Sequence, residues 1–164
     1  MLFDLKEVFT SEGSSATEEY DLSLSDLEVD GCYPFTSPVH VKAKADNTSG
    51  IVILTLETEF DYCRPCDRCF EEINSHMSFN FSHKLIESLE EEYNDDYIET
   101  PDFIVDLDNL VTTDVLLELP LKYLCKQDCQ GLCQKCGKNL NTGKCDCDDN
   151  SIDPRLEKLK ELLN

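Results

Sequence analysis

Polar and apolar residues alternate in three stretches of the first half of the chain, and alternation of this kind predicts half-buried β-strands. The stretches are 39–45, 51–62 and 73–83, and a Ser-Gly pair at 49–50 predicts a turn between the first two. One face of each of the last two stretches carries large apolar side chains. These are Val52, Leu54, Leu56 and Phe60 in one, and Ile73, Met77, Phe79 and Phe81 in the other. The simplest arrangement is an antiparallel sheet with one face against a core.

The start of the chain and its middle carry weaker patterns. Tyr20, Leu22 and Leu24 share one strand face, whereas the polar stretch 11–19 is typical of a loop. Residues 85–102 contain eight acidic side chains and no basic one, which favours a solvated loop or helix end. We therefore expect the whole sheet to come from residues 1–83.

Two later stretches have helical patterns. Residues 106–121 place apolar side chains at helical spacing, and Pro120 ends this helix. Residues 153–163 begin with Asp153 as a helix N-cap and Pro154 as the first helical residue, and three leucines follow at helical spacing. We expect the first helix to pack on the sheet and the second to be short.

The bulk composition restricts the class of partner and the compartment. The chain has 164 residues, which is enough for one domain with a core, and its formal net charge is −21. Such a charge favours basic proteins as partners, or nucleic acid through one local patch. No apolar run reaches the ~18 residues of a membrane span. The first fifteen residues lack the pattern of a signal peptide, so we expect a cytoplasmic protein with no membrane partner.

Cysteine carries the candidate chemistry of this chain. Six of the ten cysteines lie within residues 124–147. Cytosolic thiols stay reduced, so metal binding is a stronger interpretation than disulfides. Cys32 and Cys63 stand apart, and the other eight form four close pairs. The pairs are Cys66/Cys69, Cys125/Cys129, Cys133/Cys136 and Cys145/Cys147.

The last two pairs predict a small zinc ribbon. A C-x-x-C turn lets two sulfurs reach one ion, and a following glycine relieves backbone crowding; Cys133, Cys136 and Gly137 have this form. Cys145 and Cys147 follow after a short turn. Four thiolates suit a tetrahedral zinc ion.

The first two pairs predict a second zinc site. Cys66 and Cys69 lie at the end of a strand, and Cys125 and Cys129 lie just past a helix. An ion shared by both pairs would join the sheet to the C-terminal half, and its binding energy would become folding energy. We therefore expect one or two zinc ions as the cofactor.

Three other interpretations of the cysteines stay open. They are disulfides, an iron–sulfur cluster held by four cysteines, and thioredoxin-like redox chemistry at residues 66–69. The compartment disfavours the first, and the position of residues 66–69 between two strands disfavours the last. The chain has no Gly-rich phosphate loop and no nucleophile elbow, and all-cysteine zinc sites are usually closed. We therefore expect no enzyme activity and no small-molecule substrate.

One lysine-rich segment runs against the acidic composition. Residues 121–145 contain five lysines and a single acidic residue, Asp128. These lysines could contact RNA phosphates or an acidic partner, or they could only solubilise the segment and offset its thiolates. They are Lys122, Lys126, Lys135, Lys138 and Lys144.

The order of these motifs resembles one protein family. Three stretches carry the resemblance: "CDRCFEEI" at 66–73, the helix end "LLELPL" at 116–121, and "LCKQDCQGLCQKCGKNLN" at 124–141. Together they are similar to the YceD family, the large ribosomal RNA subunit accumulation proteins. Arg68 with its two flanking cysteines matches the C-x-R-C motif of the family. Cys125, Cys129, Cys133, Cys136 and Gly137 match its cysteine cluster. The resemblance covers most of the chain and implies a role in making or stabilising large-subunit rRNA, which is a process and not a chemistry.

Together these patterns predict an α+β fold in three parts. An antiparallel β-sheet or partial barrel with a packing helix takes residues 1–120, a cysteine-rich zinc knuckle takes 121–150, and a short C-terminal helix takes 151–164. The expected function is a non-enzymatic factor in large-subunit biogenesis, with a large-subunit ribosomal protein, an rRNA precursor or both as partner. The alternatives are an acidic chaperone-like binder of one basic ribosomal protein and a cysteine-dependent redox or metal enzyme. The acidic residues expected to attract a basic partner include Glu87, Glu90, Glu91, Glu92, Asp95 and Asp96.

Overall fold

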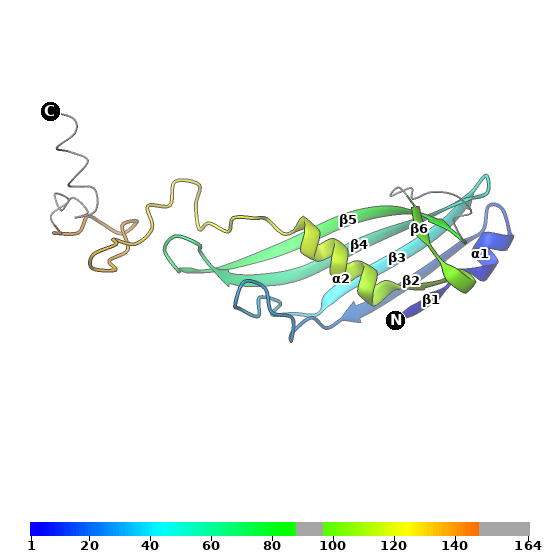
Figure 1. Ribbon diagram of the computed structural model, residues 1–164, viewed down its shortest axis with the longest axis horizontal. Helices are drawn as coiled ribbons and strands as arrows, with labels where there is room; N and C mark the ends of the chain where they lie inside the picture. The colour runs from blue at the N-terminus through cyan, green and yellow to red at the C-terminus, as the bar shows by residue number, and fades with distance from the viewer. Residues whose placement is uncertain (88–96, 148–164) are drawn as a thin grey trace, which may run out of the picture.

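The computed structural model of the protein describes residues 1–87 and 97–147, which Figure 1 shows in colour. The strands are β1 (Leu2–Asp4), β2 (Ser15–Leu22), β3 (Val39–Thr48), β4 (Ile51–Pro65), β5 (Glu72–Ile86), β6 (Tyr97–Glu99) and β7 (Ile104–Asp106). The helices are α1 (Lys6–Thr10), the 3-10 helix η1 (Pro101–Phe103) and α2 (Leu107–Glu118). The predicted C-terminal helix and most of the predicted acidic surface, residues 90–96, lie outside the described residues.

Five strands form the main sheet, in the order β2-β3-β4-β5-β6. Strands β2 to β5 are antiparallel neighbours, whereas β6 runs parallel to β5. A two-residue turn joins β3 to β4, where Ser49 and Gly50 have φ of 56° and 83°. Two successive residues with positive φ are typical of the type I′ hairpin turn, whose twist suits the flanking strands. The turn predicted at this dipeptide is therefore confirmed.

Alternation of side chains puts one face of the sheet into the core. Val39, Val41, Ala43 and Ala45 in β3 are fully buried, and the residues between them are polar. Strand β4 repeats the pattern with its predicted apolar face, of which Val52, Leu54, Leu56 and Phe60 are all buried. The apolar face of β5 is half-buried and packs on the same core. The period-two predictions for these strands are confirmed.

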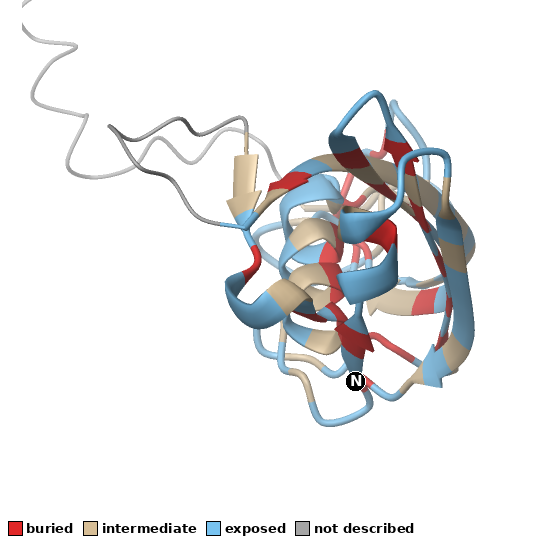
Figure 2. Ribbon diagram, turned by 90° about the vertical axis from the view of Figure 1, so that its right-hand side faces the viewer, coloured by how far each residue is buried: buried red, intermediate tan, exposed pale blue. Residues whose placement is uncertain are grey.

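The sheet curves into a half-barrel, and α2 lies across its inner face (Figure 1). The end-on view in Figure 2 shows the sheet bending round the helices, and marks buried residues in both the sheet and the helices. Asp106 caps α2, because its side chain accepts a hydrogen bond from the Asn109 backbone N–H. Leu107, Val111 and Val115 are the buried residues of the helix. The fold is thus mostly β-sheet with a few helices.

Three parts of the fold depart from the sequence-based expectation. The stretch 11–19 was expected to be a loop, but β2 begins at Ser15 and pairs with β3 along its whole length. Strand β2 lies at the edge of the sheet, so its outer face needs no apolar residues. One of its polar residues, Glu19, forms an ion pair with Lys42 of β3 at 3.8 Å. Its polar composition therefore concealed the strand.

The acidic region and the chain start hold the other departures. Strand β6 lies inside the stretch 85–102 that was expected to be a loop or helix end. Strands β1 and β7 form a separate two-stranded sheet, so the sheets are not confined to residues 1–83. Each of these strands has three residues, too few to leave a period-two signature.

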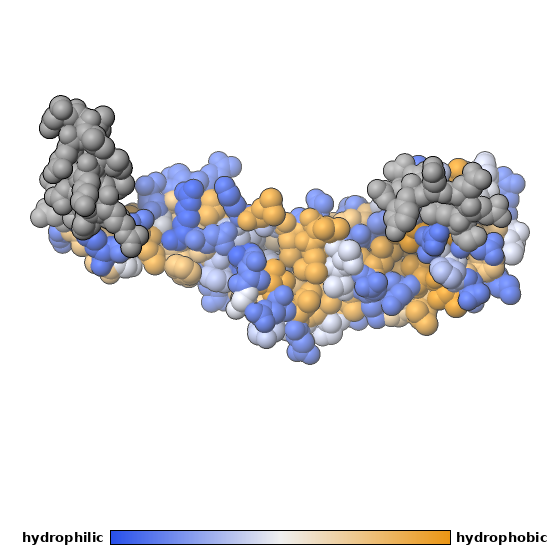
Figure 3. Space-filling view, viewed as in Figure 1, coloured by the Kyte–Doolittle hydropathy of each residue, from blue (hydrophilic) through white to orange (hydrophobic). Residues whose placement is uncertain are grey.

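The C-terminal end of α2 carries an exposed apolar area. Leu116, Leu117 and Leu121 are exposed at and just after the C-terminal end of α2, where Figure 3 shows an apolar area between hydrophilic ones. Among the described residues, no helix combines the length and the apolar character that crossing a membrane requires.

Candidate metal centres

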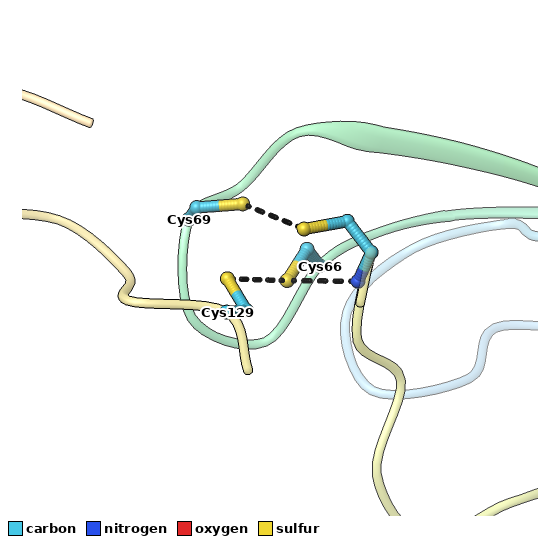
Figure 4. Close-up of side chains that lie close together, drawn as sticks. Cys66, Cys69 and Cys129 are labelled. Carbon is cyan, nitrogen blue, oxygen red and sulfur yellow. Dashed lines mark hydrogen bonds between the residues drawn. The ribbon is translucent and has the colours of Figure 1, made fainter. Parts of the chain in front are cut away.

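The turn between β4 and β5 presents the first C-x-x-C pair. Strand pairing ends at Pro65 and Glu72, so Cys66 and Cys69 lie in the turn that links the two strands. Both cysteines are buried, with exposed fractions of 0% and 5%. Figure 4 shows the Cys66 sulfur next to that of Cys129, and the Cys69 sulfur facing that of Cys125. Cys125 and Cys129 belong to the segment that follows α2. A redox C-x-x-C of the thioredoxin type would need a helix here, and the structure has a hairpin turn instead.

A clamp of two hydrogen bonds between Asp67 and Tyr123 holds the segment after α2 at this turn. The backbone N–H of Asp67 donates to the Tyr123 carbonyl at 2.9 Å, and the Tyr123 N–H donates to the Asp67 carboxylate at 2.7 Å. The Tyr123 hydroxyl donates to Ser75 at 2.6 Å, and its ring packs edge-on against Tyr62 at 5.6 Å. These contacts fix the position of Cys125, two residues further on.

The first centre contains Cys66, Cys69, Cys125 and Cys129, whose sulfurs all lie within 4.8 Å of one another. The Cys66–Cys129 sulfurs are 3.8 Å apart, and the Cys69–Cys125 sulfurs are 3.6 Å apart. Four sulfurs ~2.3 Å from one zinc ion in a tetrahedron would lie ~3.8 Å from one another. A disulfide would bring two of them to ~2.05 Å. The arrangement therefore fits a single tetrahedral ion, and every cysteine of the chain is a free thiol.

Hydrogen bonds to sulfur divide the four thiols into stronger and weaker acids. Burial opposes ionisation of Cys66, but backbone N–H groups, first that of Arg68, lower its pKa to about 6. The Asn141 side-chain amide lowers the pKa of Cys129 in the same way. Burial and the neighbouring sulfurs raise the pKa of Cys125 to about 12. A divalent ion bound among the four sulfurs would favour the ionised form of each thiol.

The second centre contains Cys133, Cys136, Cys145 and Cys147, whose sulfurs also lie within 4.8 Å of one another. It is less buried than the first, and Cys136 is exposed. Backbone N–H groups of the turn, first that of Cys136, lower the pKa of Cys133 to about 6. Gly137 has φ of 72°, which suits the crowded position after a C-x-x-C pair. This centre thus has the backbone of a metal-binding knuckle.

The loop of the second centre reaches back onto the first. The Asn141 side-chain amide donates to the Cys129 sulfur at 3.2 Å, and its oxygen accepts from the Gln130 N–H at 2.9 Å. Gly131 lies so close to the first turn that an added Cβ would sit 3.0 Å from the Arg68 carbonyl oxygen. The two centres are therefore packed on one another. The sequence pattern does not reveal this contact of Asn141, because only the place of the residue in a short turn marks it.

These two groups of four are the groups that the cysteine spacing predicts. Which metal they hold, and whether they hold one, stays a prediction. The donor set fits zinc, because four thiolates in a tetrahedron satisfy its usual structural coordination. An iron–sulfur cluster remains the alternative for the same donors.

Two cysteines lie outside both centres. The Cys63 thiol donates to a Glu72 carboxylate oxygen at 3.0 Å, and this bond raises its pKa to about 11. The Cys32 thiol donates to the Val29 carbonyl at 3.2 Å. Neither belongs to a group of metal-ligand atoms in the described part of the chain.

The five lysines of residues 121–145 are all exposed. Lys135 and Lys144 border an open pocket of about 730 Å³ beside the second centre. Lys138 is engaged locally, because its ammonium donates to the Lys144 carbonyl at 2.8 Å. Lys122 and Lys126 flank Cys125. Contact of these lysines with RNA stays a prediction.

Comparison with protein-family models matches residues 54–163 to the family described as "Large ribosomal RNA subunit accumulation protein YceD". The matched range includes all eight clustered cysteines. No solved structure matches the chain.

Relatives come from bacteria and a plant. "Uncharacterized protein YlbN" of Bacillus subtilis (strain 168) is 26% identical over 129 residues, which cover 77% of this chain and 75% of that protein. "Uncharacterized protein ML1660" of Mycobacterium leprae (strain TN) is 26% identical over 133 residues, or 77% of this chain and 60% of that protein. "Large ribosomal RNA subunit accumulation protein YCED homolog 1, chloroplastic" of Arabidopsis thaliana is 29% identical over 153 residues, or 70% of this chain and 45% of that protein. The chain therefore spans less than two thirds of the last two relatives.

Proposed function

The chain belongs to the YceD family of large ribosomal RNA subunit accumulation proteins, and from this membership we propose that it supports accumulation of the large-subunit rRNA as a non-enzymatic assembly factor. The observation that carries the proposal is the extent of the family match, which includes both candidate metal centres. The name of the Arabidopsis relative refers to the same process. We also infer a cytoplasmic location, where free thiols stay reduced.

Each cysteine cluster, in this proposal, holds one zinc ion. Bound zinc would supply a closed four-thiolate crosslink with no open coordination position, which suits a structural role. Cys69 and Cys125 are 56 residues apart in the chain, so the first centre would tie the β4–β5 turn to the segment after α2. Its binding energy would then contribute to folding. In this proposal the described part of the cysteine-rich segment, residues 121–147, would be a metal-stabilised extension of the sheet.

The charge of the chain favours a basic protein over RNA as the direct partner. A net charge of −21 attracts cationic surfaces and repels phosphate. The lysines of residues 121–145 are a local exception. However, two zinc centres with four thiolates each would together carry about four negative charges, which offsets most of these lysines. A basic large-subunit ribosomal protein is therefore the first candidate partner, and an rRNA precursor contacted through the lysines is the second.

Depletion of the protein in its own host tests the proposed function. The ratio of large-subunit to small-subunit rRNA should fall, and the wild-type gene should restore it. The double variant Cys66→Ser/Cys129→Ser should fail to restore it and should lose one of two zinc ions in native mass spectrometry. Cys32→Ser, which changes a cysteine outside both centres, should restore the ratio and keep both ions.

Three results would count against parts of this proposal. An unchanged rRNA ratio after depletion would exclude the proposed function. Unchanged zinc content in the double variant would exclude the first centre as a zinc site. Rapid alkylation of all eight clustered cysteines in the purified protein would favour the redox alternative.

A further inference from the structure

The two C-x-x-C turns share the same backbone hydrogen bonds. In the first turn the Phe70 N–H donates to the Cys66 carbonyl at 3.0 Å, and in the second the Gly137 N–H donates to the Cys133 carbonyl at 2.8 Å. In each turn the N–H of the first cysteine also donates to the carbonyl of the residue five positions later, at 2.8 Å and 2.9 Å. Phe70 therefore occupies the position that glycine occupies in the other turn.

This position requires a left-handed backbone, which glycine adopts without strain and phenylalanine does not. Phe70 has φ of 58°, close to the 72° of Gly137. An L-residue with a Cβ loses free energy in this region, and such residues concentrate at functional sites. The strain is unnecessary for the turn itself, since the second turn makes the same bonds with glycine.

Packing does not offset this strain. The Phe70 side chain is 69% exposed and so gains little from burial. Phe103, which also has positive φ, offers a contrast, because its ring packs on Phe9 at a centroid distance of 5.3 Å. Phe70 is thus an exposed aromatic ring, held in a strained conformation on a turn whose two cysteines belong to the first metal centre.

We propose that Phe70 is an anchor residue for a basic polypeptide partner, and this inference rests on the proposed role in large-subunit assembly. Aromatic side chains, Phe among them, are enriched in protein interfaces, and the hydrogen bonds of the turn fix the backbone that carries this one. Glu71 and Glu72 follow it directly and are both exposed, so the ring stands beside negative charge. Those carboxylates attract Lys and Arg side chains and repel phosphate. The complementary partner therefore presents an apolar side chain or pocket flanked by basic residues.

The substitution Phe70→Gly separates this role from a structural one. The variant relieves the backbone strain and keeps the turn hydrogen bonds, so Tm should stay the same or rise by a few degrees and the metal content should not change. Binding to the proteins extracted from purified large ribosomal subunits should weaken at least tenfold, as for loss of a central aromatic anchor. Phe70→Trp should retain binding, because it keeps a large aromatic side chain at the same place.

Leu2→Ala is the matched control. Leu2 is an apolar residue that is 70% exposed, about as much as Phe70. It lies in β1, away from the β4–β5 turn in Figure 1. This variant should bind the same ribosomal proteins within twofold of wild type. Binding should also weaken between 0.1 M and 0.5 M salt, because the attraction involves exposed charges.

Each contrary result has a distinct meaning. A lower Tm for Phe70→Gly, or binding equal to wild type, would overturn the anchor role and leave the proposed function intact. The inference would also be overturned if the wild-type protein bound rRNA fragments and no ribosomal protein, and if Phe70→Gly lost the rRNA binding. Phe70 would then contact RNA and not a polypeptide. An unchanged rRNA ratio on depletion would overturn the proposed function whatever the Phe70 variants bind.

Discussion

Substitution of Asn141 by alanine should weaken metal binding at the first centre, although Asn141 lies in the loop of the second. Its amide donates to the buried Cys129 sulfur at 3.2 Å, and no sulfur ligand is altered by the change. A hydrogen bond to a charged acceptor contributes about 1.5–3 kcal/mol. Loss of an outer-sphere partner typically costs 10–100-fold in metal affinity, which is about 1.4–2.7 kcal/mol. The two ranges agree, so we expect a 10–100-fold weaker first centre.

Competition with a chromophoric zinc chelator measures this effect. Thr142→Ala is the matched control, because the neighbouring hydroxyl bonds to the Asn139 carbonyl and not to a sulfur. It should leave the affinity within twofold of wild type. Cys136→Ser, which breaks the second centre, should also weaken the first by loosening the loop that holds Asn141. In the Asn141→Ala background this second effect should shrink, because both changes remove the same bond. Affinity within twofold of wild type for Asn141→Ala would refute the reasoning.

Three further predictions follow from single sites. Gly131→Ala should destabilise the protein more than Gly137→Ala. Both positions have φ near 70°, but only at Gly131 would an added Cβ lie 3.0 Å from a carbonyl oxygen. Equal losses in the free energy of unfolding, measured by chemical denaturation, would contradict this. Cys63 should alkylate slowly at pH 8, since the Glu72 bond raises its pKa to about 11. Glu72→Ala should speed the reaction roughly tenfold, because the gain in thiolate fraction outweighs the lower nucleophilicity of a less basic thiolate; an unchanged rate would reject the contact. Leu56→Ala should cost about 2–5 kcal/mol in the free energy of unfolding, because the side chain is fully buried; a loss under 1 kcal/mol would mean that the core is not packed as described.

Local pattern was sufficient where one strand buries one face. The alternation in β3, β4 and β5 appears in the sequence because every second side chain meets the core. The pairing of cysteines at C-x-x-C spacing is local in the same sense, since two cysteines three residues apart can reach one ion on a tight turn. Net charge is a sum over residues and needs no fold.

Tertiary structure alone decided the features that depend on partners distant in sequence. Strand β2 is polar and becomes a strand only because β3 supplies its hydrogen bonds, and β1 exists only as the partner of β7, about a hundred residues later. The clamp between Asp67 and Tyr123 and the reach of Asn141 to Cys129 are of this kind. The strain at Phe70 is a further example. The sequence after Cys69 does not show that Phe70 has the left-handed backbone that Gly137 has in the second turn. Sequence shows which side chains repeat at a period, whereas a hydrogen bond between distant segments leaves no period and appears only when the chain has folded.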